Sequence, residues 1–279
     1  MTRGRDRRRR AVAFALTGLL VAPGCRAGRL RPAFPETLPR ADRVAAAIAA
    51  RRHALTSVRG FARVSYESGD AHAAARHAIV VAPPDRFRLE ALSPIGAVAV
   101  VTCDRNELAV WVRRDHRTYR GAATRASVAA YTGLPVDPAD VASVLVGLPP
   151  ERRMIGDPTL TRDEGAGSLR LRVPIEGGRQ DVWVAPDSML PVASETAIES
   201  GRTLRVELGN YRTIAGLAFP LSIDMHILPD GGRIQVRYES PTIGAPVSAD
   251  VFAFPPRPGV DEVRLGTSPP DTLPFGAAE

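Results

Sequence analysis

The sequence predicts a mainly β protein, an antiparallel sandwich or barrel of about eleven strands interrupted by short helices. Apolar residues occupy every second position in many short segments, which is the spacing of a half-buried strand. Residues 86–91 are an example, because Phe87, Leu89 and Ala91 alternate there with charged side chains. Turns rich in proline and glycine separate these segments, and their close spacing indicates antiparallel strands.

The same alternation recurs along the chain after Thr56. It is seen in residues 108–113, 169–173, 182–184, 204–208 and 234–238. The turns between such segments contain Pro83-Pro84, Gly177-Gly178, Pro186-Asp187, Gly201 and Asp230-Gly231-Gly232. Glycine, proline and aspartate are the residues that tight turns favour.

Three stretches carry helical signals instead. Residues 42–53 have apolar side chains near helical spacing, with Asp42 as the expected N-cap. A short helix is expected at 125–132, and another begins after Asp137, which precedes a proline, and ends at Gly147. Helices inserted in a meander can close the mouth of an open barrel. The interior then either holds a small ligand or is filled by side chains.

The N-terminus has the pattern of an export signal that ends in a lipid-modified cysteine. Arginines at 7–10 precede an uncharged apolar run at 11–21, and small residues at 22–24 lead into Cys25. Such a pattern defines a secretory signal, and the run is shorter than the about 20 residues that span a bilayer. We expect removal of residues 1–24 and attachment of diacylglycerol to Cys25. The alternatives are an ordinary secreted protein cleaved nearby and a retained N-terminal anchor.

Composition divides the rest of the chain into three parts. Residues 25–41 are rich in proline and arginine and are expected to form a tether that carries the domain clear of the bilayer. Residues 42–264 contain the strand and helix signals and are expected to form the barrel domain. Residues 265–279 are rich in proline and small side chains and are expected to form a disordered tail.

The charge balance excludes a nucleic-acid-binding protein. The chain carries a net charge of +7, but residues 1–24 hold six arginines and one aspartate, so the mature chain keeps only +2. A nearly balanced chain offers no electrostatic footprint for nucleic acid. Once Cys25 is modified, Cys103 is the one remaining thiol, so an intramolecular disulfide cannot form. Cys103 follows an apolar run and is expected to be buried in a strand.

No catalytic or metal-binding motif occurs in the sequence. None of the five histidines belongs to an HExxH motif or pairs with a cysteine at zinc-ligand spacing. His72 and His77 lie five residues apart, on opposite faces of a strand, and both are expected at the solvated surface. There is no GxSxG elbow and no glycine-rich phosphate loop. We therefore expect neither an enzyme nor a metal or cofactor site.

Several segments resemble the LolA/LolB superfamily of lipoprotein carriers and acceptors. They are VRGFARVSY (58–66), RFRLEALSPIGAVAVV (86–101), Tyr119, YTGLPVDPADVASVLVGLPP (131–150) and GLAFPLSIDM (216–225). An arginine-rich strand that enters a short Pro-Gly loop, followed by a Gly-Leu-Pro-Val segment before a helix, is most similar to LolB, the outer-membrane lipoprotein acceptor. The segment VFAFPPRPGV (251–260) is more similar to LolA. The resemblance covers residues 42–260.

This resemblance implies a half-open antiparallel barrel with a helical lid over a hydrophobic cavity. Family members receive lipoprotein acyl chains in this cavity, and an apolar residue in the Pro-Gly loop contacts the membrane. Here Pro94, Ile95 and Gly96 form that loop, and Val141 and Val144 are expected on the lid. The residues expected to line the cavity are Phe87, Leu89, Val98, Val100, Leu108, Val110, Leu145, Leu148, Leu171, Val173, Leu204, Val206, Ile223 and Met225.

Together these expectations form one hypothesis for function. The protein would be held by its lipid anchor on the periplasmic side of the outer membrane and would bind lipoprotein acyl chains or phospholipid. It would receive lipoproteins from a periplasmic carrier and help to insert them. Arg26, which follows Cys25, favours the outer membrane over retention at the inner membrane. The alternative is a structural or interaction lipoprotein of the envelope with the same fold and a filled core.

Overall fold

The structure is a computed structural model that describes residues 34–69, 71–132, 135–198, 201–229, 231–256 and 258–265. The expected signal segment, Cys25, much of the expected tether and the expected tail after residue 265 lie outside the described residues. All described residues belong to one compact unit. Among them, no helix has both the length and the apolar character that crossing a membrane requires.

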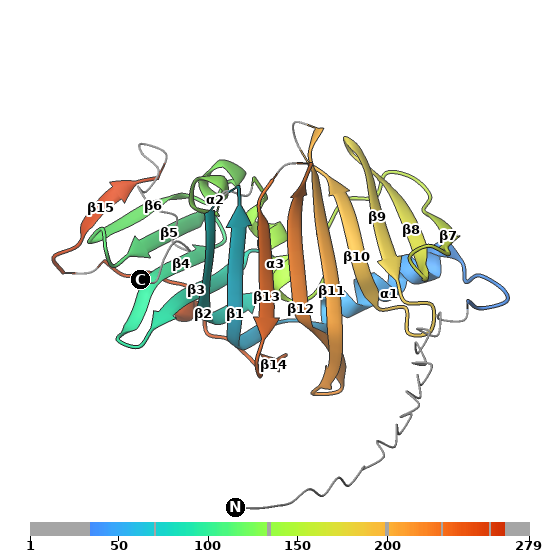
Figure 1. The fold of residues 1–279 in the computed structure, drawn as a ribbon, viewed down its shortest axis with the longest axis horizontal. Coiled ribbons are helices and arrows are strands. Elements are labelled where there is room, and N and C mark those ends of the chain that lie inside the picture. Colours follow the sequence, from blue (N-terminus) through green and yellow to red (C-terminus); the bar gives the residue numbers. More distant parts are fainter. Residues whose placement is uncertain are drawn as a thin grey trace, which may run out of the picture. The chain divides into compact units, whose positions relative to one another are not determined.

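The described residues form fifteen strands in one sheet (Figure 1). The strands are β1 (Val58–Ser68), β2 (Ala71–Ala82), β3 (Arg86–Ser93), β4 (Gly96–Asp104), β5 (Glu107–Val112), β6 (Arg117–Ala122), β7 (Thr159–Asp163), β8 (Ser168–Ile175), β9 (Gly178–Val184), β10 (Pro191–Ala197), β11 (Thr203–Ile214), β12 (Leu217–Leu228), β13 (Arg233–Tyr238), β14 (Thr242–Ile243) and β15 (Asp261–Arg264). Their order is β15-β6-β5-β4-β3-β2-β1-β13-β12-β11-β10-β9-β8-β7, and β14 pairs with β1 beside this path.

The sheet consists of two meanders joined by one long-range pairing. Strands β1 to β6 and strands β7 to β13 each follow one another in sequence, and the meanders meet where Ala62 of β1 lies opposite Tyr238 of β13. The parallel pairing of β15 with β6 is the exception to an otherwise antiparallel sheet. Within the described part of the chain, β7 and β15 end the sheet on separate sides, so it stays open. The predicted mainly β, half-open antiparallel fold is confirmed.

The strand count exceeds the expected eleven mainly because three strands are short. Strands β7, β14 and β15 have 5, 2 and 4 residues. A two-residue period needs about four residues to become visible. Strand β14 is too short to show this period, and β7 and β15 each contain a single aliphatic residue, Leu160 and Val263, so none of the three shows an alternation.

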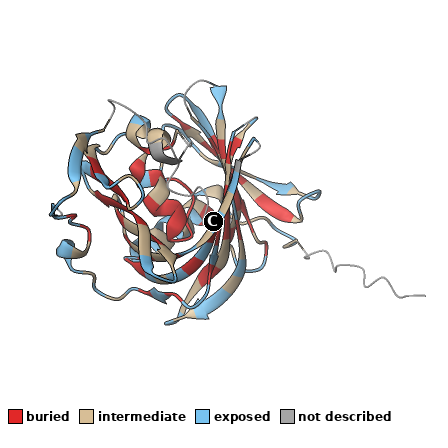
Figure 2. Cartoon of the chain, turned by 60° about the vertical axis from the view of Figure 1, so that its left-hand side comes forward, coloured by how far each residue is buried: buried red, intermediate tan, exposed pale blue. Residues whose placement is uncertain are grey.

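In the described part of the chain, three α-helices lie between or before the strands: α1 (Ala41–Ala54), α2 (Arg125–Thr132) and α3 (Pro138–Leu145). Helix α1 packs against β8, and α3 packs against β2 and β3. A 3₁₀ turn, η2, follows at Ala249–Val251. Figure 2 shows the sheet curving around buried helical residues, so the core lies between one face of the sheet and the helices.

The helix ends confirm one predicted cap and correct another. Asp137 is the N-cap residue of α3, and Gly147 takes a left-handed conformation just past its end, with φ of 76°. The prediction of Asp42 as a cap is wrong, because Arg40 holds the N-cap position of α1. Asp42 instead lies in the first turn, where its carboxylate accepts a hydrogen bond from the amide of Arg43 at 2.9 Å and pairs with Arg40.

Candidate functional site

The register of the strands shows which predicted residues share a face of the sheet. Residues directly opposite each other on paired strands project to the same side. One such row contains Leu171, Val182, Ser194, Val206, Met225 and Ile234. A second row contains Ile79, Leu89, Val101, Val110 and Tyr119. We call the side that carries these rows and faces the helices the inner face, and the opposite side the outer face.

The inner face brings together most of the residues expected to line a cavity. One buried cluster, the main cluster, contains Phe87, Leu108, Val110, Leu145, Leu148, Leu204, Val206, Ile223 and Met225, with Leu89 half-buried against it. Val141 and Val144 on α3 also pack in this cluster. Leu171 and Val173 lie in a second cluster, where they pack beside Val44 of α1.

Val100 does not share this face. Val100 lies directly opposite Trp111 on β5 and packs with Ala109 and Phe254 in a third buried cluster on the outer face. Val98 is half-buried at a β-bulge, where the pairing with β3 skips from Ala99 to Ala97, so alternation along β4 does not assign its side. Strand β4 is apolar on both sides, so alternation could not decide which side faces inward. The C-terminal segment, through Phe254 and Val260, covers the outer side.

A small apolar cavity lies between α3 and the inner face. Its volume is about 40 Å³, and its lining is Val64, His77, Ile79, Leu89, Val136, Val141, Leu145, Met225, Ile234 and Val236. Pockets that hold small ligands usually measure about 300–1,000 Å³. In this conformation α3 therefore fills the space that an acyl chain would need.

Polar side-chain contacts around the edge of α3 hold the helix in place. Arg152 makes a bidentate pair with the buried carboxylate of Asp140, at 2.6 and 2.7 Å. Arg125 pairs with Asp137 at 2.7 Å. Tyr238 donates a hydrogen bond of 2.9 Å to the carbonyl oxygen of Leu145. The helix is therefore fastened by side chains around its edge, while its apolar stripe faces the cavity.

A second space, lined by apolar side chains together with Arg52, Glu151, Arg152 and Gln180, lies between α1 and the strands β8 and β9. It has a volume of about 210 Å³ and includes the predicted residues Leu171 and Val173 in its lining. Ile48 of α1 and Met154 also line it. Met154 and its neighbour Ile155 are large apolar side chains that remain exposed to solvent. This groove and the cavity beneath α3 both contain predicted lining residues.

His77 is a site residue that sequence analysis placed wrongly. It was expected in solvent, but it is only 2% exposed and lines the cavity beneath α3. Its Nδ1 lies 3.1 Å from the carbonyl oxygen of Ala75. Burial lowers the pKa of His77. The inner-face parity that His77 shares with Ile79 was the signal that could have located it.

The Pro-Gly loop projects an apolar side chain into solvent. Ile95 is 80% exposed at the tip of the turn between β3 and β4. Ser93 fixes the turn, because its hydroxyl donates to the carbonyl oxygen of Gly96 at 2.9 Å and accepts from the amide of Ile95 at 3.3 Å. Arg113 donates to the carbonyl oxygen of Ile95 at 3.4 Å. The turn is therefore held in place while Ile95 itself stays uncovered.

Over the described ranges, no group of histidine, cysteine, aspartate and glutamate side chains has the arrangement needed to hold a metal ion. The sequence matches no protein-family model and no curated protein.

Solved structures do match the fold. A domain from Vibrio parahaemolyticus whose proposed role is outer membrane lipoprotein sorting has a TM-score of 0.55 and 10% identity, over 76% of this chain and 97% of that one. A DUF1329 family protein from Desulfovibrio piger has a TM-score of 0.55 and 12% identity, over 77% and 98%. A LolA superfamily protein from Nitrosomonas europaea has a TM-score of 0.50 and 14% identity, over 78% and 99%.

These matches define the class of fold. The described chain has a LolA-like fold, a large open antiparallel sheet with short helices against one face, as the sequence resemblance implied. At these identities the matches establish the fold alone, and the expected closeness to LolB stays a prediction.

Proposed function

We propose that this protein binds the acyl chains of lipoproteins, or a phospholipid, between the inner face of its sheet and its helices. In this proposal it is a lipid-anchored protein of the bacterial envelope that assists the insertion of lipoproteins into the outer membrane. The observation that carries the proposal is the apolar inner face beneath α3, formed by β1, β2, β3, β12 and β13, which is covered by a separate helix rather than by the sheet itself. The LolA-like fold supports the same function.

Binding requires α3 to move, because the cavity beneath it measures only about 40 Å³. Outward movement of α3 would separate Val141 and Leu145 from the sheet and expose the apolar rows of β1, β2, β12 and β13. The rim contacts of Arg152 and Arg125 can exchange for water, whereas the apolar surfaces gain an acyl chain as a new partner. A ligand that binds only the open arrangement shifts the protein toward it.

The exposed loop supports delivery to a membrane. Burial of a branched aliphatic side chain such as Ile95 contributes about 1.5–3 kcal/mol. The contacts of Ser93 and Arg113 hold the loop so that Ile95 projects outward. The loop would therefore contact the acyl layer first when the protein approaches a bilayer.

The anchor of this proposal comes from the N-terminal sequence, and its partners come from the resemblance to the LolA/LolB superfamily. Diacylglycerol on Cys25 would hold the protein at the membrane, and Arg26 favours the outer membrane. The partners are a periplasmic lipoprotein carrier as donor and the outer membrane as acceptor of the cargo.

A second candidate function is a scaffold with a filled core. The small volume beneath α3 favours it, because side chains of α3 already occupy the interior. In this case the protein would act as a structural or interaction lipoprotein of the envelope. It would contact its partners with its surface and would bind no lipid in its core.

Native mass spectrometry separates the two functions. The Cys25→Ala variant is expressed in the periplasm of a Gram-negative host, purified without detergent and sprayed under gentle conditions. We expect an additional mass that matches a phospholipid or an acyl chain and disappears on collisional activation. A clean apo mass from the same preparation would support the scaffold.

Two matched variants locate the ligand. Leu89→Trp places a large ring in the cavity from a half-buried position on the inner face of β3. Val80→Trp makes a comparable change at a half-buried position on the outer side of β2. We expect the first variant to lose the adduct and the second to keep it. Equal retention by both variants would contradict binding beneath α3.

A further inference from the structure

A row of three arginines crosses the outer face of the sheet where the two meanders meet. Arg237 of β13 lies directly opposite Arg63 of β1, and Arg63 lies directly opposite Arg76 of β2. All three residues are exposed. Neighbouring strands lie about 4.8 Å apart, so the Cα atoms of three positively charged residues fall within about 10 Å. Like charges directly opposite each other on paired strands are destabilising, and the row therefore favours an anionic partner.

Carboxylates neutralise the two outer arginines of the row but not the middle one. Arg76 pairs with Glu239 at 2.7 Å, and Arg237 pairs with Asp224 at 2.8 Å. Arg63 forms no ion pair with a carboxylate in the described part of the chain. The centre of the row therefore presents an uncompensated positive charge to solvent.

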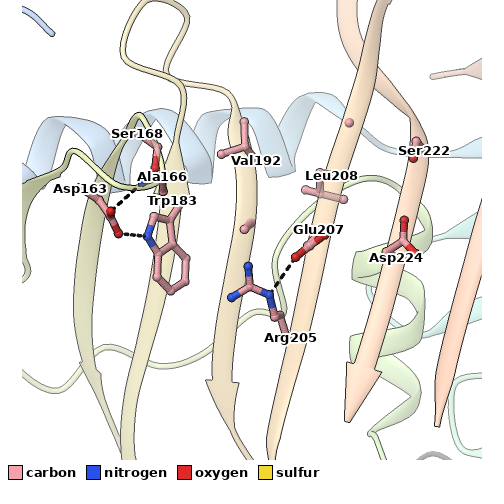
Figure 3. A pocket seen from close by; sticks show the side chains of 12 residues that line it. Asp163, Ala166, Ser168, Trp183, Val192, Arg205, Glu207, Leu208, Ser222 and Asp224 are labelled. Carbon is pink, nitrogen blue, oxygen red and sulfur yellow. Dashed lines mark hydrogen bonds and ion pairs between the residues drawn. The ribbon is translucent and has the colours of Figure 1, made fainter. Parts of the chain in front are cut away.

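Arginines on the outer face of β8 to β11 have carboxylate partners within the chain. Asp181 of β9 pairs with three of them, which are Arg170, Arg172 and Arg179. Figure 3 shows the guanidinium of Arg205 bonded to Glu207, at 2.9 Å. These arginines stabilise neighbouring strands, whereas Arg63 has no such role in the sheet.

Two large apolar side chains flank the arginine row. Phe61 lies two residues before Arg63 on the same face of β1, is 42% exposed, and has the guanidinium of Arg76 4.1 Å from its ring centre. At the other end, Leu92 of β3 lies directly opposite Arg76, and the turn that carries Ile95 follows it. Exposed apolar groups beside arginines suit a membrane surface, where the apolar groups enter the acyl layer and the guanidinium groups stay at the phosphates.

Two further arginines lie at the turn beside the Ile95 loop. Arg113 donates to the carbonyl oxygen of Ile95 at 3.4 Å, and Arg114 follows it and is exposed. Neither arginine forms an ion pair with a carboxylate of the described ranges. The carboxylate of the same turn, Asp115, accepts a hydrogen bond from the hydroxyl of Tyr119 at 3.4 Å. With two arginines against one carboxylate, the turn has an excess of positive charge.

We infer that Arg63, Arg113 and Arg114, the arginine patch, bind the phosphate groups of anionic phospholipids when the Ile95 loop contacts a membrane. The inference rests on the membrane contact in the proposed function and adds the class of lipid. A guanidinium group donates two parallel hydrogen bonds to phosphate oxygens, and an anionic bilayer attracts basic residues near its surface. Phe61 and Ile95 favour a bilayer over an acidic soluble protein, because a bilayer offers phosphates and acyl chains together.

Vesicle sedimentation with the Cys25→Ala protein tests the inference. The vesicles contain either phosphatidylcholine alone or an equimolar mixture of phosphatidylcholine and phosphatidylglycerol. We expect tighter binding to the mixture at low salt and loss of this preference at high salt, because salt screens exposed charges. Equal binding to both vesicles, or binding to neither, would overturn the inference. Binding of soluble polyglutamate without binding to anionic vesicles would also overturn it and would assign the arginines to an acidic protein.

A double variant locates the anionic lipid on the protein. Arg63→Gln with Arg114→Gln removes two charges from the arginine patch and leaves Arg113 to hold the loop. Each basic residue near an anionic surface contributes about fivefold in affinity. We therefore expect this variant to bind the anionic vesicles about 25-fold more weakly than its parent.

The matched control removes two arginines that have a carboxylate partner. Arg172→Gln with Arg179→Gln changes the net charge by the same amount on the outer face of β8 and β9, and Asp181 keeps its pair with Arg170 at 2.7 Å. We expect this control to bind anionic vesicles much as its parent does. An equal loss in both double variants would show an effect of net charge alone and would contradict the inference. Thermal midpoints equal to that of the parent confirm folding.

Two readouts separate this inference from acyl binding. Ile95→Ser removes the apolar contact and should weaken binding to both kinds of vesicle, whereas the arginine double variant should weaken binding to the anionic vesicles alone. Native mass spectrometry of the arginine double variant should still show the lipid adduct, since its inner face is unchanged. If the double variant keeps the anionic preference of its parent, the arginine patch is not the site. Absence of the adduct from every protein would overturn acyl binding alone.

Discussion

His77 places an ionisable ring in a cavity that is otherwise apolar. The ring lies beneath α3, beside Val136 and Val141, and burial lowers its pKa. In the unfolded chain the pKa of a histidine is about 6.5. Above that pH both states hold the neutral ring, and His77 makes no difference to stability. As the pH falls below it, the unfolded chain takes up the proton first and the folded state loses stability.

We therefore expect the free energy of unfolding to fall between pH 6.5 and the lowered pKa of His77. Urea titrations at pH 8, 6 and 5 measure this dependence. His77→Leu removes the titrating group and should flatten this part of the profile. His72→Leu, at an exposed position of the same strand, is the control and should retain it. A profile that is the same in all three proteins would contradict the role of His77.

Ile95 is the residue on which membrane delivery depends in the proposed function. Because the side chain is 80% exposed, Ile95→Glu should change stability by less than about 0.5 kcal/mol. We expect this variant to fail to replace the wild-type protein in a depletion strain, whereas Ile95→Leu should replace it. Growth and the location of lipoproteins are the readouts. Full complementation by Ile95→Glu would remove the loop from the mechanism.

At the scale of the elements, the packing of α3 against the sheet is stabilised by one buried ion pair. Asp140 is 3% exposed and is held by Arg152 from the segment that follows the helix. Removal of one partner of a buried pair leaves an uncompensated charge and costs about 3–5 kcal/mol. We expect Arg152→Met to lose stability of this order in urea unfolding.

The double variant Asp140→Leu, Arg152→Met distinguishes charge from packing. It removes both partners, so most of the lost stability should return. If the double variant is less stable than Arg152→Met, the pair contributes through its geometry rather than through compensation of charge. The lipid content of both variants by mass spectrometry then reports how firmly α3 closes the cavity.

At the scale of the whole molecule, Cys103 reports whether the sheet opens. It is fully buried in the main cluster, and burial raises the pKa of its thiol to about 12. In the Cys25→Ala protein it is the single thiol. We expect no reaction with a thiol-specific reagent at pH 8 on the time scale of minutes, and complete reaction in urea. Rapid labelling under native conditions would indicate frequent opening of the core.

Local patterns in the sequence predict the hairpins and the three helices α1, α2 and α3 well. The alternation in 86–91 and the turn at Pro94 define β3 and its connection, and the sequence from Asp137 to Gly147 defines α3. These features depend on contacts between residues close in sequence. Where both sides of a strand are apolar, as in β4, the same patterns cannot assign the inner side.

The sequence by itself determined an antiparallel β fold, the position of α3 and the exposed loop at Ile95. The tertiary structure alone decided the pairing of β1 with β13, the burial of His77 and the closed cavity. It also decided that the C-terminal segment covers Val100. The physical reason is the separation along the chain of the residues that determine each feature. Turns and alternation are set by neighbours in the chain, whereas burial and cavity volume depend on segments far apart in sequence that meet only in the folded protein.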